Sequence, residues 1–160
     1  MNKPSLTEIV DQLASSLKAR GQMMASAESC TGGLIAGACT EISGSSDWFE
    51  RGFVTYSNAA KTELLDVPAA LIKDQGAVSD AVARAMAAGA LVHSRAQWAV
   101  AVTGVAGPTG GSVDKPVGTV WLAWATPHGV QAEHHRFPGD RTAVRRATVQ
   151  RALAGLLQRL

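Results

Sequence analysis

Residues 23–33 read MMASAESCTGG, and this stretch decides the fold. Its first half, Met23 to Ala27, is short and largely apolar, which is typical of a buried strand. Small polar residues and two glycines follow, and the segment from Leu34 to Ile42 has the pattern of a helix. A strand that leads through a polar turn into a helix is the unit of an open α/β sheet, and such sheets bind ligands at this edge.

The polar turn between the strand and the helix has two interpretations. In the structural one, small polar side chains cap the N-terminus of the helix that follows. In the functional one, free backbone N–H groups at the helix start hold an anion or a developing oxyanion. The turn alone does not decide between them, so Ser29 to Gly33 are candidates for either role.

The rest of the chain alternates between helical and strand patterns. Pro127-His128-Gly129 forms a tight turn between two apolar segments, which predicts an antiparallel hairpin late in the chain. Helices at both ends and this hairpin indicate an α/β fold, with a mixed sheet and helices on both faces. No linker, repeat or low-complexity tract interrupts residues 1–160, so we expect one domain. Helices are predicted near 6–20, 59–65, 68–74, 80–94 and from 141 onward, and strands near 51–56, 97–102, 117–125 and 130–137.

Composition excludes several classes of partner. The net charge of +2 gives no reason to expect nucleic acid, and no apolar run reaches the length of a membrane span. Two cysteines and four scattered histidines give no metal-ligand spacing, so no metal or other cofactor is expected. Cys30 and Cys39 would lie about 13 Å apart along a helix, too far for a disulfide, which indicates a reduced cytoplasmic protein.

One aromatic segment bears on self-association. Trp48, Phe49 and Phe53 lie close together in the sequence. They either belong to the core or form a surface between copies of the chain, and we expect a homo-oligomer.

Four polar clusters stand out by position. Three of them follow predicted strands, so they meet at one edge of the sheet if those strands are neighbours. The fourth lies at the start of the last helix. The clusters are Ser29-Cys30-Thr31, Tyr56-Ser57-Asn58 with Lys61, Thr103 with the glycine-rich loop after it, and Gly139-Asp140-Arg141 with Arg145.

Ser29 and Lys61 could form a catalytic pair. A serine hydroxyl becomes a nucleophile when a neighbour accepts its proton, and a lysine with a lowered pKa can do so. Tyr56 could relay or donate a proton, and the N–H groups of residues 31–33 could hold the oxyanion. In the structural alternative, Ser29 is a cap, Tyr56 a half-buried phenol and Lys61 an exposed helix residue. Cys30 is a rival nucleophile.

The two remaining clusters suit the binding of a nucleotide. The loop TGVAGPTGGSVD, residues 103–114, matches neither a P-loop nor a dinucleotide fingerprint, but its glycines allow the backbone to approach a ligand. Arg141 and Arg145 are four residues apart, so they share one face of a helix. A phosphate is one partner for this pair, and solvent is the other.

Five stretches that contain these clusters resemble the CinA C-terminal-domain family, in the form that stands alone and hydrolyses an amide. They span most of the chain in family order. The stretches are AESCTGG (27–33), GSSDWFERGFVTYSNAAK (44–61), GAVS (76–79), AVTGVAGPTGGSVDKPVGTVWLAWAT (101–126) and GDRTAVRR (139–146).

The resemblance implies a three-layer α/β/α domain that hydrolyses the carboxamide of nicotinamide mononucleotide. The products would be nicotinic acid mononucleotide and ammonia, in pyridine nucleotide salvage and without a metal. The larger domain that precedes this one in full-length family members is missing, so the associated pyrophosphatase activity is expected to be absent. A non-catalytic nucleotide-binding or regulatory module is the alternative.

The resemblance also assigns roles to individual residues. The catalytic residues it implies are Ser29, Tyr56 and Lys61. Either Tyr56 or Lys61 could be the base. The carboxamide could be attacked by Ser29 itself, which gives a covalent intermediate, or directly by water. The candidates for substrate binding are Cys30, Thr31, Gly32, Gly33, Thr103, Gly104, Gly107, Arg141 and Arg145.

Overall fold

The computed structural model describes residues 2–160, and a five-stranded sheet lies at its centre. The strand order is β2-β1-β3-β4-β5. The first three strands in this order are parallel, whereas β4 runs antiparallel to β3 and to β5, so the predicted mixed sheet and late hairpin are confirmed. The strands are β1 (Met24–Glu28), β2 (Phe49–Val54), β3 (Trp98–Gly104), β4 (Thr119–Thr126) and β5 (Gly129–Arg136).

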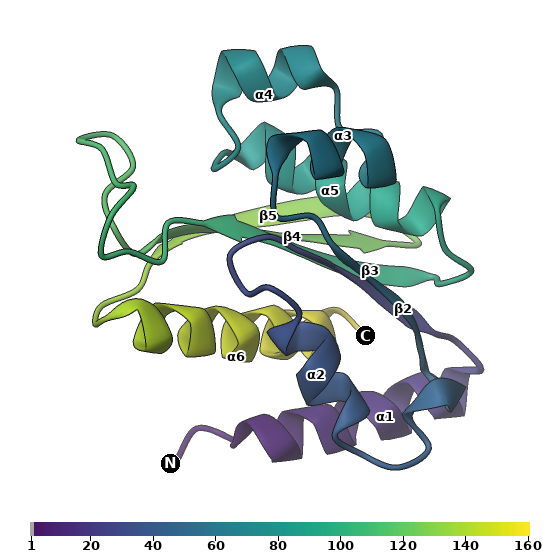
Figure 1. Ribbon diagram of the computed structural model, residues 1–160. Coiled ribbons are helices and arrows are strands. Elements are labelled where there is room, and N and C mark those ends of the chain that lie inside the picture. The colour runs from purple at the N-terminus through teal and green to yellow at the C-terminus, as the bar shows by residue number, and fades with distance from the viewer. Residues whose placement is uncertain (1) are drawn as a thin grey trace.

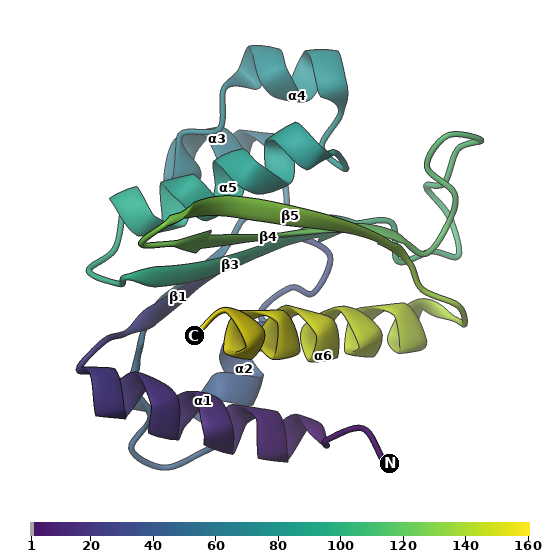
Figure 2. The same cartoon turned by 180° about the vertical axis from the view of Figure 1, so that it is seen from behind.

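Within the described part of the chain, six α-helices cover the two faces of the sheet, which gives the predicted three layers (Figure 1). One face carries α1 (Leu6–Arg20), α2 (Leu34–Thr40) and α6 (Arg141–Arg159). The other carries α3 (Asn58–Leu65), α4 (Ala69–Gln75) and α5 (Asp80–Val92), as the view from behind also shows (Figure 2). A short 3₁₀ turn, Ser45–Asp47, precedes β2.

The two faces of the sheet carry side chains of different size. Because neighbouring residues of a strand point to opposite faces, the central strands send most of their large residues one way and their alanines the other, where Trp121 is the large exception. The alanine face packs against α5, which also lies close to α3: at Gly89 of α5 an added Cβ would overlap the Leu65 carbonyl. The large residues are Met24, Val100, Val102, Leu122 and Trp124, and the alanines are Ala25, Ala27, Ala99, Ala101, Ala123 and Ala125.

Two predicted boundaries are wrong in informative ways. The strand expected over 51–56 ends at Val54: the Thr55 N–H still donates to the Glu28 carbonyl of β1, and the carbonyls of Thr55 and Tyr56 accept hydrogen bonds from the Lys61 amine. Thr103 and Gly104, expected in a loop, still belong to β3, where they pair with β4.

The aromatic segment belongs to the core. Trp48 is fully buried and packs edge-on against Phe49. Phe49 and Phe53 are partly buried and pack on opposite faces of the sheet. Of the three side chains, Trp48 is closed to a second copy of the chain, and Phe49 and Phe53 pack mainly against the core.

Candidate active site

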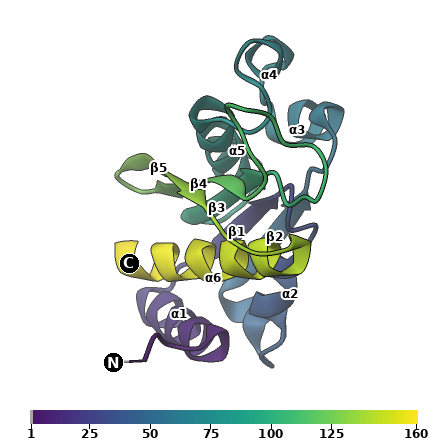
Figure 3. The same ribbon diagram turned by 90° about the vertical axis from the view of Figure 1, so that its left-hand side faces the viewer.

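The carboxyl ends of three parallel strands form one edge of the sheet, as the sequence predicted. Glu28, the last residue of β1, lies level with Val54 of β2 and Val102 of β3. The N-terminus of α6 and the loop after β3 lie at the same end of the molecule, which faces the viewer in Figure 3. Segments far apart in the sequence therefore meet beside Ser29.

Ser29 and Lys61 are in direct contact. The Ser57 side chain caps α3 by accepting a hydrogen bond from the N–H of Ala60, and this fixes the first turn of the helix that carries Lys61. The Lys61 Nζ atom lies 3.0 Å from Ser29 Oγ. It also lies 3.0 Å from the Thr55 carbonyl oxygen and 3.3 Å from that of Tyr56. The prediction that Lys61 faces Ser29 is confirmed, and an exposed Lys61 is excluded.

The surroundings of Lys61 lower the pKa of its amine. Its side chain is 1% exposed, and burial lowers its pKa because the charged form loses its water. A neutral amine has two hydrogens and one lone pair. The two carbonyls can accept the two hydrogens, which leaves the lone pair for the hydroxyl hydrogen of Ser29.

The turn after Ser29 supplies free main-chain donors, but Gly32, one of the three that the sequence suggested, is not among them. Gly32 and Gly33 both have positive φ, 59° and 108°, which glycine adopts without strain. The Gly32 N–H donates to the Ser29 carbonyl oxygen at 3.0 Å, so it is not available to an oxyanion. The N–H groups of Thr31 and Gly33 have no acceptor among residues 2–160, whereas the Cys30 N–H faces its own thiol.

Glu28 is a site residue to which sequence reasoning gave no role. Its side chain is fully buried, and its carboxylate accepts hydrogen bonds from the Thr31 hydroxyl and from the N–H groups of Ile35 and Ala36. It thus takes the donors at the start of α2, where the N-cap residue Gly33 has no side chain to do so. These two helix amides therefore hold the Glu28 carboxylate and are not available to a ligand.

The two arginines of α6 bind the backbone of the site. Arg145 donates to the carbonyl oxygens of Cys30 at 3.1 Å and Thr31 at 3.2 Å. Arg141 donates to the Gly107 carbonyl oxygen at 2.9 Å and to the Tyr56 hydroxyl at 3.3 Å. The fourth cluster is therefore joined to the other three.

Tyr56 contributes to the site in two separate ways. Its carbonyl accepts from Lys61, whereas its side chain is 63% exposed and its hydroxyl pairs with Arg141. In this geometry the group in contact with the Ser29 hydroxyl is the Lys61 amine, which favours Lys61 over Tyr56 as the base.

The remaining candidates hold the loops in place. Thr103 Oγ1 donates to the Ala77 carbonyl oxygen at 2.9 Å, which attaches the segment 76–79 to the end of β3. At Gly104 an added Cβ would lie 2.7 Å from Val120 Cγ2, and at Gly107, where φ is 79°, it would overlap Val117. The glycines therefore permit close packing of the loop.

Cys30 is unsuited to act as a nucleophile. Burial raises the pKa of its thiol to about 11, so the thiol is protonated at neutral pH. Both cysteines are free, as predicted, and both are buried.

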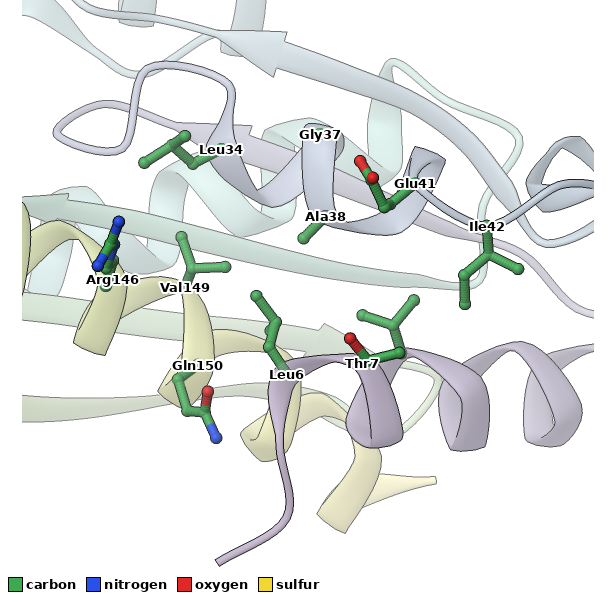
Figure 4. A pocket seen from close by; sticks show the side chains of 11 residues that line it. Leu6, Thr7, Leu34, Gly37, Ala38, Glu41, Ile42, Arg146, Val149 and Gln150 are labelled. Atoms are coloured by element: carbon green, nitrogen blue, oxygen red, sulfur yellow. The ribbon is translucent and has the colours of Figure 1, made fainter.

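A separate hollow of about 610 Å³ lies between α1, α2 and α6 (Figure 4). Its walls are mostly apolar, with Glu41 and Arg146 at the rim, and it contains neither Ser29 nor Lys61.

Within residues 2–160 no three His, Cys, Asp or Glu side chains gather as in a metal site. In the same part of the chain, no helix has the length and apolarity that crossing a membrane would need.

Fold and geometry define the chain as an α/β/α protein with a serine–lysine pair at the carboxyl edge of its sheet, an arrangement suited to hydrolysis by an activated serine. The chain belongs to the CinA family: the model of the CinA C-terminal domain matches residues 6–160.

Close relatives carry a more specific name. The chain is 55% identical over 153 residues to the nicotinamide-nucleotide amidohydrolase PncC of Pseudomonas putida, covering 96% of both chains. It is 50% identical over 159 residues to the protein of the same name from Escherichia coli K12, covering 99% of this chain and 96% of the relative. A crystal structure of a competence/damage inducible protein from Agrobacterium tumefaciens superposes with a TM-score of 0.94 at 48% identity, covering 99% of this chain and 98% of that one.

Proposed function

We propose that this chain is a nicotinamide-nucleotide amidohydrolase, which converts nicotinamide mononucleotide and water into nicotinic acid mononucleotide and ammonia. Relatives of nearly the same length that share half of its residues carry this name. The single observation that carries the chemistry is the contact between the buried Lys61 amine and the Ser29 hydroxyl, at 3.0 Å. An amide needs a nucleophile, a site for the oxyanion and an acid for the leaving ammonia, and this pair can supply the first and the last.

In the first half of the reaction, Ser29 Oγ attacks the carboxamide carbon and Lys61 Nζ takes the hydroxyl proton. The oxygen of the tetrahedral intermediate becomes negative and is stabilised by the unpaired N–H groups of the turn after Ser29. Lys61 then gives its proton to the amide nitrogen, the C–N bond breaks, and ammonia leaves an acyl ester on Ser29.

In the second half, water replaces ammonia. The neutral Lys61 amine takes a proton from water, whose oxygen attacks the ester carbon. The C–O bond to Ser29 breaks, the proton returns to Ser29 Oγ, and the carboxylic acid is released and ionises. Atoms balance as amide plus water to acid plus ammonia, and neither Lys61 nor Ser29 is consumed.

The phosphate of the substrate suits the arginines at the start of α6. A guanidinium has five N–H donors, and the backbone of the site uses only two from Arg145. The remaining donors of Arg141 and Arg145 provide positive charge for a phosphate, close to the glycine loop.

The test is release of ammonia from nicotinamide mononucleotide by purified protein, with the Ser29→Ala variant as the control. We expect ammonia from the wild type and almost none from the variant. Quenched reactions analysed by mass spectrometry should show an acyl adduct on the peptide that contains Ser29. Persistent activity of Ser29→Ala would instead favour direct attack by water.

A folded wild-type protein that binds the nucleotide but releases no ammonia would favour the regulatory module over the enzyme. Binding measured by calorimetry, in the same buffer as the activity assay, separates these outcomes.

The proposal extends to a reduced cytoplasm as the location, which the two free buried cysteines support. It also includes self-association of the chain, which light scattering of the purified protein would test.

A further inference from the structure

We propose that Glu28 is the positioning residue that holds the Ser29 turn in its reactive conformation. This inference rests on the proposed function, because it concerns the same serine. Glu28 precedes Ser29 directly and ends β1, so its backbone is fixed by the sheet on both sides. Its carboxylate then reaches past the turn to the first residues of α2.

The contacts of Glu28 close the turn at both of its ends. One carboxylate oxygen accepts from the Thr31 hydroxyl at 2.5 Å and from the Ile35 N–H at 2.8 Å. The other accepts from the Ala36 N–H at 3.1 Å. One buried side chain therefore connects the strand, the middle of the turn and the helix, and the chain between these points includes Ser29.

The chemistry of the donors specifies a carboxylate. All three partners are donors, and a carboxylate only accepts. A glutamine would direct its NH₂ group at one of these donors, where two hydrogens would face each other in a buried space. An aspartate keeps the charge, but its shorter side chain does not reach both helix amides.

Glu28 also determines which main-chain donors remain for the substrate. The carboxylate uses the Ile35 and Ala36 amides of α2, so the N–H groups in this segment that stay unpaired are those of Thr31 and Gly33, in the turn that follows Ser29. A shift of the turn would move the nucleophile and these donors together. Displacements of about 1 Å at a reacting centre can reduce rates roughly 100-fold.

The test compares Glu28→Gln and Glu28→Asp with wild type in steady-state hydrolysis of nicotinamide mononucleotide. We expect kcat per folded molecule to fall roughly 10- to 100-fold in both variants. KM should change far less, because the arginines and the glycine loop are untouched. The pH profile of kcat/KM should shift as well, since the contact between Ser29 and Lys61 sets the proton transfer.

The matched control is Ser5→Ala, which removes the N-cap of α1, away from the site. Like the Glu28 variants, Ser5→Ala removes a side-chain acceptor from the N-terminus of a helix. It should therefore lower the free energy of unfolding and leave kcat and the pH profile unchanged. A purely structural role for Glu28 would give the same result as this control. Wild-type kcat and pH profile in folded Glu28→Gln would overturn the proposal.

A readout without turnover separates this proposal from the proposed function. Amide hydrogen exchange should be slow at Ile35 and Ala36 in wild type and at least tenfold faster at Ala36 in Glu28→Gln. Unchanged exchange would also overturn the proposal. If the Glu28 variants do not fold, Thr31→Val removes one of the three donors and should lower kcat by a smaller factor; an unchanged kcat there would count against the proposal.

Discussion

At the scale of single residues, the proposed mechanism depends on the ionisation of Lys61. Burial lowers its pKa below the ordinary value of 10.5, so the neutral form becomes abundant at a lower pH than for an exposed lysine. Since only the neutral amine accepts a proton, kcat/KM should rise with pH and level off below 10.5. A pH series of initial rates measures this, and a profile that falls throughout this range would contradict Lys61 as the base.

A substitution isolates proton acceptance from positive charge. Lys61→Arg keeps the charge but introduces a group that stays protonated in proteins. We expect a loss of at least about 100-fold in kcat, the order that general-base catalysis contributes. Lys18→Arg, on the exposed side of α1, is the control and should behave as wild type.

At the scale of elements, one carboxylate connects α6 to the edge strand β5. Glu133 forms paired hydrogen bonds with Arg151, at 2.8 and 2.9 Å, and also contacts His135 and Arg159. The hydrogen bond from Arg151 is the main reason why the pKa of Glu133 falls to about 2 from its ordinary 4.5. Arg159 in turn stacks on the Trp124 ring, 3.9 Å from its centroid.

The lowered pKa of Glu133 has a consequence for acid stability. A depressed carboxyl pKa contributes stability that is present above pH 4.5 and is lost as the pH falls toward 2. Glu133→Gln should therefore lower stability at pH 7 and flatten its decline between pH 4.5 and 2, measured by urea unfolding. Glu41→Gln, at an exposed position, should keep the wild-type slope.

Two helical glycines should respond in opposite ways to alanine. At Gly155 of α6 an added Cβ would overlap the Trp124 ring, whereas at Gly37 of α2 it would meet nothing within 4 Å. We expect Gly155→Ala to cost about 1–3 kcal/mol through overpacking. Gly37→Ala should gain about 0.5–1 kcal/mol, because alanine loses less backbone entropy in a helix. The midpoints of urea unfolding of the two variants test this prediction. Equal changes in the free energy of unfolding would contradict the close packing of Gly155 against Trp124.

The elements were predictable from the sequence where local patterns specify them. The strand–turn–helix around Ser29, the hairpin after β4 and the alanine-rich α5 all follow from periodicity and turn residues. The end of β2 was not predicted, because the carbonyls of Thr55 and Tyr56 accept hydrogen bonds from the Lys61 side chain, a contact that the strand pattern does not encode. The contact between Arg145 and the Thr31 carbonyl joins residues 114 positions apart, and no local pattern encodes such a pair.

At the scale of the whole molecule, the site connects elements from both layers of helices. Lys61 comes from α3 and Arg145 from α6, on opposite faces of the sheet, and both contact the turn after β1. A ligand bound there should therefore stabilise the entire fold. In Ser29→Ala, nicotinamide mononucleotide at 100 times its Kd should add about 2.7 kcal/mol and raise Tm on the order of 5–10 °C. The riboside, without a phosphate, should give a smaller shift at equal concentration; equal shifts would contradict the arginine assignment.

The antiparallel course of β4 has a practical consequence. Because β4 starts level with the end of β3 and runs back, the Pro127-His128 corner lies at the rim of the sheet opposite to Ser29. A fluorophore or an affinity handle introduced at this corner would sit a full strand length from the reacting groups, and the protein could be immobilised there with its catalytic end open to solution.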